Sequence, residues 1–150
     1  MSKKRTICYN IKASWHTISR MYNSHAVDHD SSISVGYVLL NLHRENGIPS
    51  TQIAPQLGME PRSLTRLLKA MEQNGLIRKE ADKIDKRQVN VFLTEKGYKQ
   101  RLVAKKTVKE FNQVLSDQID EADLQIFQNT LEKIIRITEQ NFKTSIWEDQ

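Results

Sequence analysis

The chain has 150 residues, of which 38% are hydrophobic and 27% are charged, a composition typical of one globular domain and not of a disordered or repeat protein. No stretch approaches the roughly 20 consecutive apolar residues of a membrane-spanning helix, and the basic residues 1–5 are not followed by the apolar core of a signal peptide. The single cysteine excludes an internal disulfide, which suits a reducing compartment. We therefore expect a cytoplasmic protein with one domain, residues 1–150.

The formal net charge is +5, and its distribution along the chain is uneven. Residues 62–106 contain thirteen Lys or Arg against five Asp or Glu, whereas residues 120–150 contain three against seven. A basic middle and an acidic end predict one surface that meets a polyanion and another that stays away from it.

Apolar residues at helical spacing predict two helices in the first third of the chain. They are Ile7, Ile11, Trp15, Ile18 and Tyr22 in the first helix, and Val35, Val38, Leu39 and Leu42 in the second. A polar stretch separates the two, and Ser32 at its end is a suitable N-cap for the second helix. Asn46, Gly47 and Pro49 are expected to end this helix.

The next segment has the pattern of a helix-turn-helix. We expect a short helix over residues 51–57, capped by Ser50, with Ile53, Ala54 and Leu57 facing inward. Gly58 opens a three-residue turn, and Pro61 suits the first position of a second helix, residues 61–74, with Leu64, Leu67, Leu68 and Met71 on its buried side. Pro55 is expected to bend or tighten the short helix.

A β-hairpin and two long helices complete the prediction. Residues 76–80 and 89–93 are strand-like, and residues 85–87 form the charged turn between them. Thr94 caps the following helix and Asp120 caps the last one, which has acidic residues in its first turn. The predicted fold is mainly α with a small β-hairpin wing: a winged helix-turn-helix over about 33–93, with helical dimerisation regions at about 5–27 and 94–145. The helical ends carry more apolar surface than a small core can bury, which favours a partner subunit.

Several polar side chains of the second helix lie away from its apolar stripe, and the hairpin turn adds two cations. The candidate DNA-binding residues are Arg62, Ser63, Thr65, Arg66, Lys69, Lys86 and Arg87. Arg makes bidentate contacts to guanine, Ser and Thr bond bases or phosphates, and Lys contacts phosphates. Asp85 is either a turn-former or an anchor that holds Arg87 in place. The alternative is a solvated helix face and a hairpin turn whose charges only maintain solubility.

The same residues resemble those of the MarR-type (multiple antibiotic resistance regulator) winged-helix transcription factors. The resemblance rests on residues 74–77 after the second helix, on Asp82 and residues 85–87 in the wing, and on residues 93–97 at the start of the next helix. It implies a homodimer with intertwined first and last helices, bound to successive major grooves of a palindrome-like operator in double-stranded DNA. It also implies that Arg87 enters the minor groove and that residues 62–66 face the major groove. Ile84 departs from the family pattern, in which another basic residue is common at this position.

Three regulatory sites remain open. The resemblance implies a cavity between the dimer helices and the winged domain, with Trp15, His16, Ile18, Met21 and Tyr22 as its candidate lining for an unidentified small molecule. Cys8 is either a redox sensor, as in some relatives, or a small buried hydrophobe. His25 and His29 have helical spacing and zinc-sensing relatives exist, but no ligand set is complete, so we predict no metal site.

The predicted function is a homodimeric DNA-binding regulator, a repressor that an effector releases. The alternatives are a winged-helix module that binds an acidic protein partner, and a redox- or metal-responsive regulator with the same fold. No phosphate-binding loop, nucleophile motif or paired-carboxylate site has a persuasive context, so we do not expect an enzyme, and we expect no cofactor.

Overall fold

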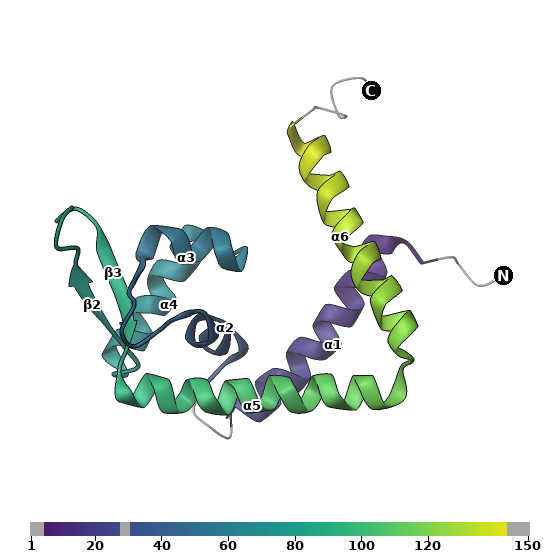
Figure 1. Ribbon diagram of the computed structural model, residues 1–150, viewed down its shortest axis with the longest axis horizontal. Coiled ribbons are helices and arrows are strands. Elements are labelled where there is room, and N and C mark those ends of the chain that lie inside the picture. Colours follow the sequence, from purple (N-terminus) through teal and green to yellow (C-terminus); the bar gives the residue numbers. More distant parts are fainter. Residues whose placement is uncertain (1–4, 28–30, 144–150) are drawn as a thin grey trace. The chain divides into compact units, whose positions relative to one another are not determined.

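The computed structural model describes residues 5–27 and 31–143 of the chain. Its contacts divide the chain into two compact units, Met1–Val108 and Lys109–Gln150, which are considered separately below. The fold is predominantly helical with one small antiparallel sheet, as the sequence predicts (Figure 1).

The first unit contains the winged helix-turn-helix. Its elements in chain order are α1 (Ile7–Val27), α2 (Ile33–Asn41), β1 (Ile48–Pro49), α3 (Ser50–Leu57), α4 (Pro61–Gln73), β2 (Ile77–Ala81), β3 (Val89–Leu93) and the greater part of α5 (Glu95–Gln118). Gly58 has φ of 60° at the end of α3, a left-handed conformation that glycine adopts without a steric penalty. The tight turn between α3 and α4 therefore depends on this residue.

Two of the predicted helix caps are confirmed by hydrogen bonds. The Ser32 side chain accepts from the backbone N–H of Val35 at 3.3 Å, and the Thr94 hydroxyl accepts from the backbone N–H of Gly97 at 3.0 Å. The prediction for Ser50 is wrong, because α3 begins at Ser50 itself and is preceded by Pro49, which has no side-chain acceptor. Pro49 has φ of −54° and ψ of 128°, outside the helical region, and makes no side-chain capping bond. Pro55 lies inside α3, which continues to Leu57.

The sheet has three strands in the order β1-β3-β2, all antiparallel. The hairpin pairs Ile77 with Leu93 and Ala81 with Val89, so the first strand starts one residue later than predicted. Sequence patterns missed β1, which pairs Ile48 with Val91. A strand of two residues that ends in proline has no alternation to detect, and proline is tolerated there because β1 lies at the edge of the sheet.

In the part of the chain that the structure describes, the buried apolar side chains all come from α2 to β3. They are Val38, Leu39, Leu42, Ile53, Ala54, Leu64, Leu68, Met71, Leu76, Ile77, Val91 and Leu93. Leu57 and Leu67 are partly buried and pack against this core. The inward-facing residues predicted for α3 and α4 are therefore confirmed, and the helix-turn-helix and the wing share one core.

The end of α4 is tied to the start of α5 by three hydrogen bonds. The backbone carbonyl of Asn74 accepts from Lys96 Nζ at 2.8 Å, and that of Gly75 accepts from the Thr94 hydroxyl at 2.6 Å. The backbone N–H of Thr94 donates to the carbonyl of Leu76 at 3.1 Å. A Cβ on Gly97 would overlap this same Leu76 carbonyl, so only glycine permits so close an approach of α5.

The second unit contains the end of α5 and α6 (Glu121–Lys143). Glu121 and Asp123 lie in the first turn of α6, where the helix dipole favours negative charge. Ile126, Phe127, Ile135 and Ile137 on this helix are exposed. No helix among the described residues is both long enough and apolar enough to cross a membrane.

Candidate nucleic-acid interface

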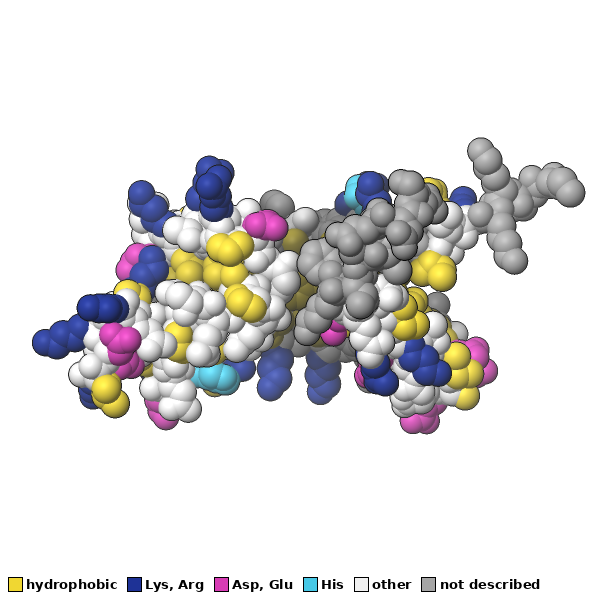
Figure 2. All heavy atoms as spheres, turned by 90° about the horizontal axis from the view of Figure 1, so that it is seen from above, with side chains coloured by type: hydrophobic (Ala, Val, Ile, Leu, Met, Phe, Trp, Pro, Cys, Tyr) yellow, Lys and Arg dark blue, Asp and Glu magenta, His cyan; other side chains and the backbone are white. Residues whose placement is uncertain are grey.

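Helix α4 presents a basic face opposite its buried stripe. Leu64, Leu68 and Met71 are buried, whereas the predicted DNA-contacting residues of this helix are exposed: Arg62, Ser63, Thr65, Arg66 and Lys69. None of the ion pairs found among the described residues involves the three cations of this face. Several Lys and Arg side chains project from the winged domain (Figure 2). Such a face, with its positive charges unneutralised, suits a polyanion.

Thr65 differs from its neighbours on this face because its hydroxyl donates to the backbone carbonyl of Pro61 at 2.9 Å. A threonine hydroxyl that bonds one turn back along the helix retains its acceptor lone pairs. Thr65 therefore offers a ligand an acceptor and a methyl group rather than a donor.

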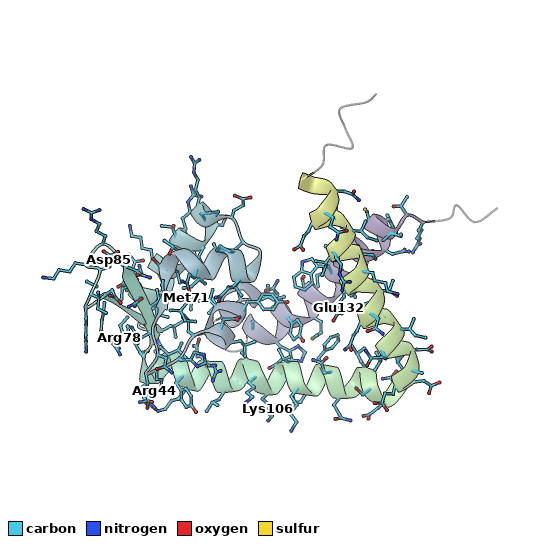
Figure 3. The ribbon with its side chains drawn as sticks, turned by 45° about the horizontal axis from the view of Figure 1, so that its top comes forward. Arg44, Met71, Arg78, Asp85, Lys106 and Glu132 are labelled. Atoms are coloured by element: carbon cyan, nitrogen blue, oxygen red, sulfur yellow. The ribbon has the colours of Figure 1, made fainter. Side chains whose placement is uncertain are left out.

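Side-chain contacts brace the wing against the helix. Lys79 Nζ on β2 lies 2.9 Å from Glu72 Oε2 on α4. Arg78, labelled in Figure 3, pairs with Glu80 on the same strand, and its guanidinium lies 4.3 Å from the centre of the Phe92 ring on β3. The partial exposure of these pairs makes each one weak. The Lys79–Glu72 pair joins the hairpin to α4, whereas the two contacts of Arg78 lie within the hairpin.

Asp82 organises the turn between the two strands. Its Oδ1 accepts from the backbone N–H groups of Ile84 at 2.8 Å and Asp85 at 3.0 Å, and its Oδ2 accepts from Asn90 Nδ2 at 2.9 Å. These bonds favour the charged form, so the backbone N–H groups of Asp85 and Ile84, and then the Asn90 amide, lower the pKa of the Asp82 carboxyl. This role of Asp82 was not predicted from the sequence. The signal was an Asp that begins a turn and whose side chain can bond two and three residues ahead.

Asp85 lies at the end of the hairpin (Figure 3). Its Oδ1 accepts from the backbone N–H of Arg87 at 3.1 Å, and its backbone carbonyl accepts from Gln88 at 2.8 Å. The contact with Arg87 is therefore made to the backbone, and it shapes the turn from which Lys86 and Arg87 extend as exposed side chains.

An apolar cavity lies within the first unit, among residues of α1, α2 and α5. The space open to the centre of a water molecule is about 70 Å³, several times the roughly 10–15 Å³ that one water needs. Its lining includes Tyr22, His25, Gly36, Tyr37, Leu40, Gln100, Val103 and Ala104. Among the described lining residues none is Lys, Arg, Asp or Glu. Gln100 Oε1 is buried and has no hydrogen-bond partner in the described part of the chain.

The five residues predicted for an effector pocket are only partly brought together. Tyr22 lines the cavity, where burial raises its pKa, with a smaller contribution from Tyr37. Trp15 is exposed and stacks on Tyr37 with the ring centres 6.0 Å apart, which places it next to a lining residue. His16 is exposed, and Ile18 and Met21 are half-buried, but none of these three lines the cavity. The contributions of α5 were missed, because α5 lies far from α1 in the chain.

The residues considered for redox or metal sensing show no assembled site. Cys8 is exposed in the first turn of α1. His25 Nδ1 lies 3.0 Å from the Met21 carbonyl, and His29 falls outside the described residues. Within the part of the chain that the structure describes, no group of three or more potential metal ligands occurs.

Comparison with known proteins identifies relatives of this chain. The model of the MarR family matches residues 36–89. The HTH-type transcriptional regulator TtmR of Methylorubrum extorquens (strain PA1) is 36% identical over 91 residues, which cover 61% of this chain and 47% of that protein. The HTH-type transcriptional regulator SarZ of Staphylococcus haemolyticus (strain JCSC1435) is 24% identical over 129 residues, 86% of this chain and 82% of SarZ. The chain thus spans about half the length of TtmR.

Solved structures share the fold. The S. aureus MepR–DNA complex superposes with a TM-score of 0.84 at 23% identity, covering 90% of this chain and 99% of MepR. Streptococcus pneumoniae FabT in complex with DNA has a TM-score of 0.76 at 18% identity, covering 89% and 96%. At such identities the likeness concerns the fold. The MarR family model matches residues 36–89 of this chain, and the relatives TtmR and SarZ are named as transcriptional regulators, so this part of the chain is similar to the MarR family.

Proposed function

We propose that this protein is a sequence-specific DNA-binding regulator of transcription, which acts as a homodimeric repressor in the cytoplasm. The observation that carries the proposal is the unpaired basic face of α4 next to a basic wing that is braced against it. TtmR and SarZ are named as transcriptional regulators, and MepR and FabT have been crystallised with DNA. These relatives support the proposal.

In the proposed complex α4 enters the major groove and the wing lies along the adjacent minor groove. Arg62 and Arg66 contact base edges, and Lys69 contacts phosphate. Ser63 and Thr65 add shorter contacts. At the wing, Lys86 and Arg87 meet the negative potential of the minor groove, and Asp85 shapes the turn that carries them.

The dimer is proposed from the apolar side chains of the helical ends. Ile7, Ile11 and Trp15 on α1 are exposed, and so are Ile126 and Phe127 on α6. A monomeric soluble protein rarely leaves this much apolar surface open. A second copy of the chain would cover these helices and would place two recognition helices about one turn of DNA apart.

Release from DNA is proposed to follow from a small molecule in the α1–α2–α5 cavity. The described lining has no formal charge, and it includes Gln100, whose buried Oε1 has no hydrogen-bond partner among the described residues. These features favour a neutral, mainly apolar effector with one hydrogen-bond donor. The effector releases the DNA if it binds better to the conformation whose recognition helices do not fit two half-sites.

Arginine-to-alanine variants test the DNA proposal in a fluorescence anisotropy titration across a salt series. The probe is a duplex that the wild-type protein selects from a random-sequence pool. Arg66→Ala and Arg87→Ala are each expected to weaken binding by about 10-fold or more. Arg136→Ala on α6, which removes an exposed cation far along the chain from the wing, serves as the matched control and leaves affinity unchanged. Equal affinities for all four proteins would contradict the proposal and favour a module that binds an acidic protein.

The effector proposal is tested by filling the cavity. A Cβ on Gly36 would meet only Ala104 Cβ, at 3.9 Å, so a larger side chain at this position can enter the cavity without a backbone clash. Gly36→Leu should leave DNA affinity intact and prevent release by any compound that dissociates the wild-type complex. Gln100→Leu should weaken the response selectively to compounds with a donor group. If both variants respond to the effector as the wild-type protein does, the effector binds outside this cavity.

A further inference from the structure

Ile84 is an unusual residue for the position that it occupies. Its side chain is 97% exposed, the highest value among the large apolar side chains of the described residues. Between Val38 and Leu93, a segment that the structure describes throughout, it is the only large apolar side chain that is exposed. The other exposed large apolar side chains among the described residues are Tyr37 and residues of the helical ends. Ile84 is therefore not part of a larger exposed apolar patch of the segment from Val38 to Leu93.

The turn holds Ile84 in this exposed position. Its backbone N–H donates to Asp82 Oδ1 at 2.8 Å, and the same oxygen accepts from Asp85 at 3.0 Å. Asn90 fixes the other oxygen of this carboxylate from β3, at 2.9 Å. A further backbone bond joins Asp82 to Gln88 at 2.8 Å. The turn that carries Ile84 is thus already ordered in the free chain, so a partner does not have to order it on binding.

Charged neighbours indicate which partner meets this side chain. Lys83, Lys86 and Arg87 are exposed around it, and no described ion pair engages them. An apolar partner surface on another protein would have to bury these three cations together with the isoleucine. A DNA minor groove accepts both kinds of side chain, because phosphates line its rims and sugar edges line its walls, and minor-groove proteins frequently insert apolar side chains there.

We infer that Ile84 is a DNA-contacting residue that makes an apolar contact inside the minor groove, between the phosphate contacts of the neighbouring cations. This inference rests on the proposed DNA-binding function. The contact adds affinity that does not depend on salt, because it releases no counterions, whereas each Lys or Arg contact to a phosphate does. The wing thus combines a salt-independent contact at Ile84 with salt-dependent contacts at Lys83, Lys86 and Arg87.

The test compares the salt dependence of four variants of the full chain, with the duplex that the wild-type protein selects from a random-sequence pool. Ile84→Ser should weaken binding about 5-fold at every salt concentration and leave the slope of log K against log salt unchanged. Ile84→Val keeps a branched apolar side chain and should bind within about 2-fold of the wild type. Each substitution is present twice in the proposed dimer, so Lys83→Ala should reduce the slope by about 1.8, and Ile84→Lys should increase it by about 1.8.

Thermal unfolding of each variant is the control for folding. The exposed position of Ile84 predicts an unchanged midpoint for all its substitutions. Wild-type affinity of Ile84→Ser would overturn the inference and leave the proposed function intact. A reduced slope for Ile84→Ser would also overturn it, because the isoleucine would then act only through the placement of the cations. Failure of the wild-type protein to select any duplex would overturn the proposed function and this inference with it.

Discussion

The winged domain and the helical ends of this chain bury their apolar residues to very different extents. Among the described residues, every buried apolar side chain lies between Val38 and Leu93, in one cluster that unites α2, α3, α4 and the sheet. In α1, α5 and α6 the large apolar side chains are mostly exposed or half-buried. The winged domain thus has its own core, whereas the helical ends have apolar surface and little core.

This difference shows how one chain divides two tasks. A self-sufficient core makes the position of α4 and the wing independent of any partner, so the basic surface is already assembled for the proposed binding of DNA. Helices with open apolar faces gain most of their stability by packing against another molecule. We therefore expect substitutions in the winged domain to change the stability of the folded chain, and substitutions in the helical ends to change its assembly.

The largest effect is expected from a truncation in the core of the winged domain. Leu42 is fully buried, and Leu42→Ala should lower the free energy of unfolding by about 2–5 kcal/mol. Chemical denaturation followed by circular dichroism measures this change, which should not depend on protein concentration. Ile84→Ala serves as the exposed counterpart and should stay within about 0.5 kcal/mol of the wild type. Similar losses for both variants would contradict the assignment of the core.

A pair of glycine substitutions tests the junction between α4 and α5. In Gly97→Ala the new Cβ overlaps the Leu76 carbonyl, and the resulting strain should lower the free energy of unfolding by about 1–3 kcal/mol. Gly36→Ala has ordinary contact distances and should be neutral or stabilise the helix by about 0.5–1 kcal/mol. Both are read from thermal melts. A loss of stability in Gly36→Ala but not in Gly97→Ala would contradict the close contact described between Gly97 and the Leu76 carbonyl.

An acidic substitution on α6 tests the proposed role of the helical ends. Phe127 is 58% exposed in the single chain, and Phe127→Asp should raise the dissociation constant of the dimer by about 10-fold or more, because it places a charge in an apolar contact. Sedimentation equilibrium over a range of protein concentrations measures the shift. Ile84→Asp adds the same charge to the wing and should not affect dimerisation. A wild-type protein that is monomeric throughout would contradict the dimer.

The smallest expected effect is the acid titration of the wing turn. The pKa of Asp82 is held below its ordinary value of 3.8, so its carboxylate stabilises the turn fully above that value, and the stabilisation is lost as the pH falls through the lowered pKa. Amide chemical shifts of Ile84 and Asp85, followed by NMR from pH 6 to pH 2, should move with a midpoint below 3.8. Asp82→Asn keeps the acceptor oxygen and should abolish this titration. A midpoint at or above 3.8 would contradict the bonding described for the turn.

Sequence reasoning succeeded where the signal is local. The spacing of Leu64, Leu68 and Met71 predicted which face of α4 is buried, and the caps at Ser32 and Thr94 followed from side chains that bond within one turn. The exposure of the predicted cations on α4 follows from the same periodicity.

The features that sequence reasoning missed depend on contacts between distant segments. Gly97 resembles any helical glycine until its contact with the Leu76 carbonyl is seen, and β1 is defined only by its pairing with Val91. The cavity joins α1 and α2 to α5, so Gln100 and Val103 could not be assigned to it from periodicity. The bonds of Asp82 with residues 84 and 85 were within reach of turn chemistry, but its contact with Asn90 required the register of the hairpin.

The most direct test of the central claim is the sequence of the DNA that the protein prefers. Wild-type protein is used to select duplexes from a random-sequence pool at a salt concentration near 0.15 M, and the enriched sequences are aligned. Two recognition helices related by a twofold axis predict an inverted repeat whose half-sites are centred about 10 base pairs apart. Enrichment of no sequence, or of a single unrepeated site, would contradict the account of a dimer that uses α4 and the wing to recognise DNA.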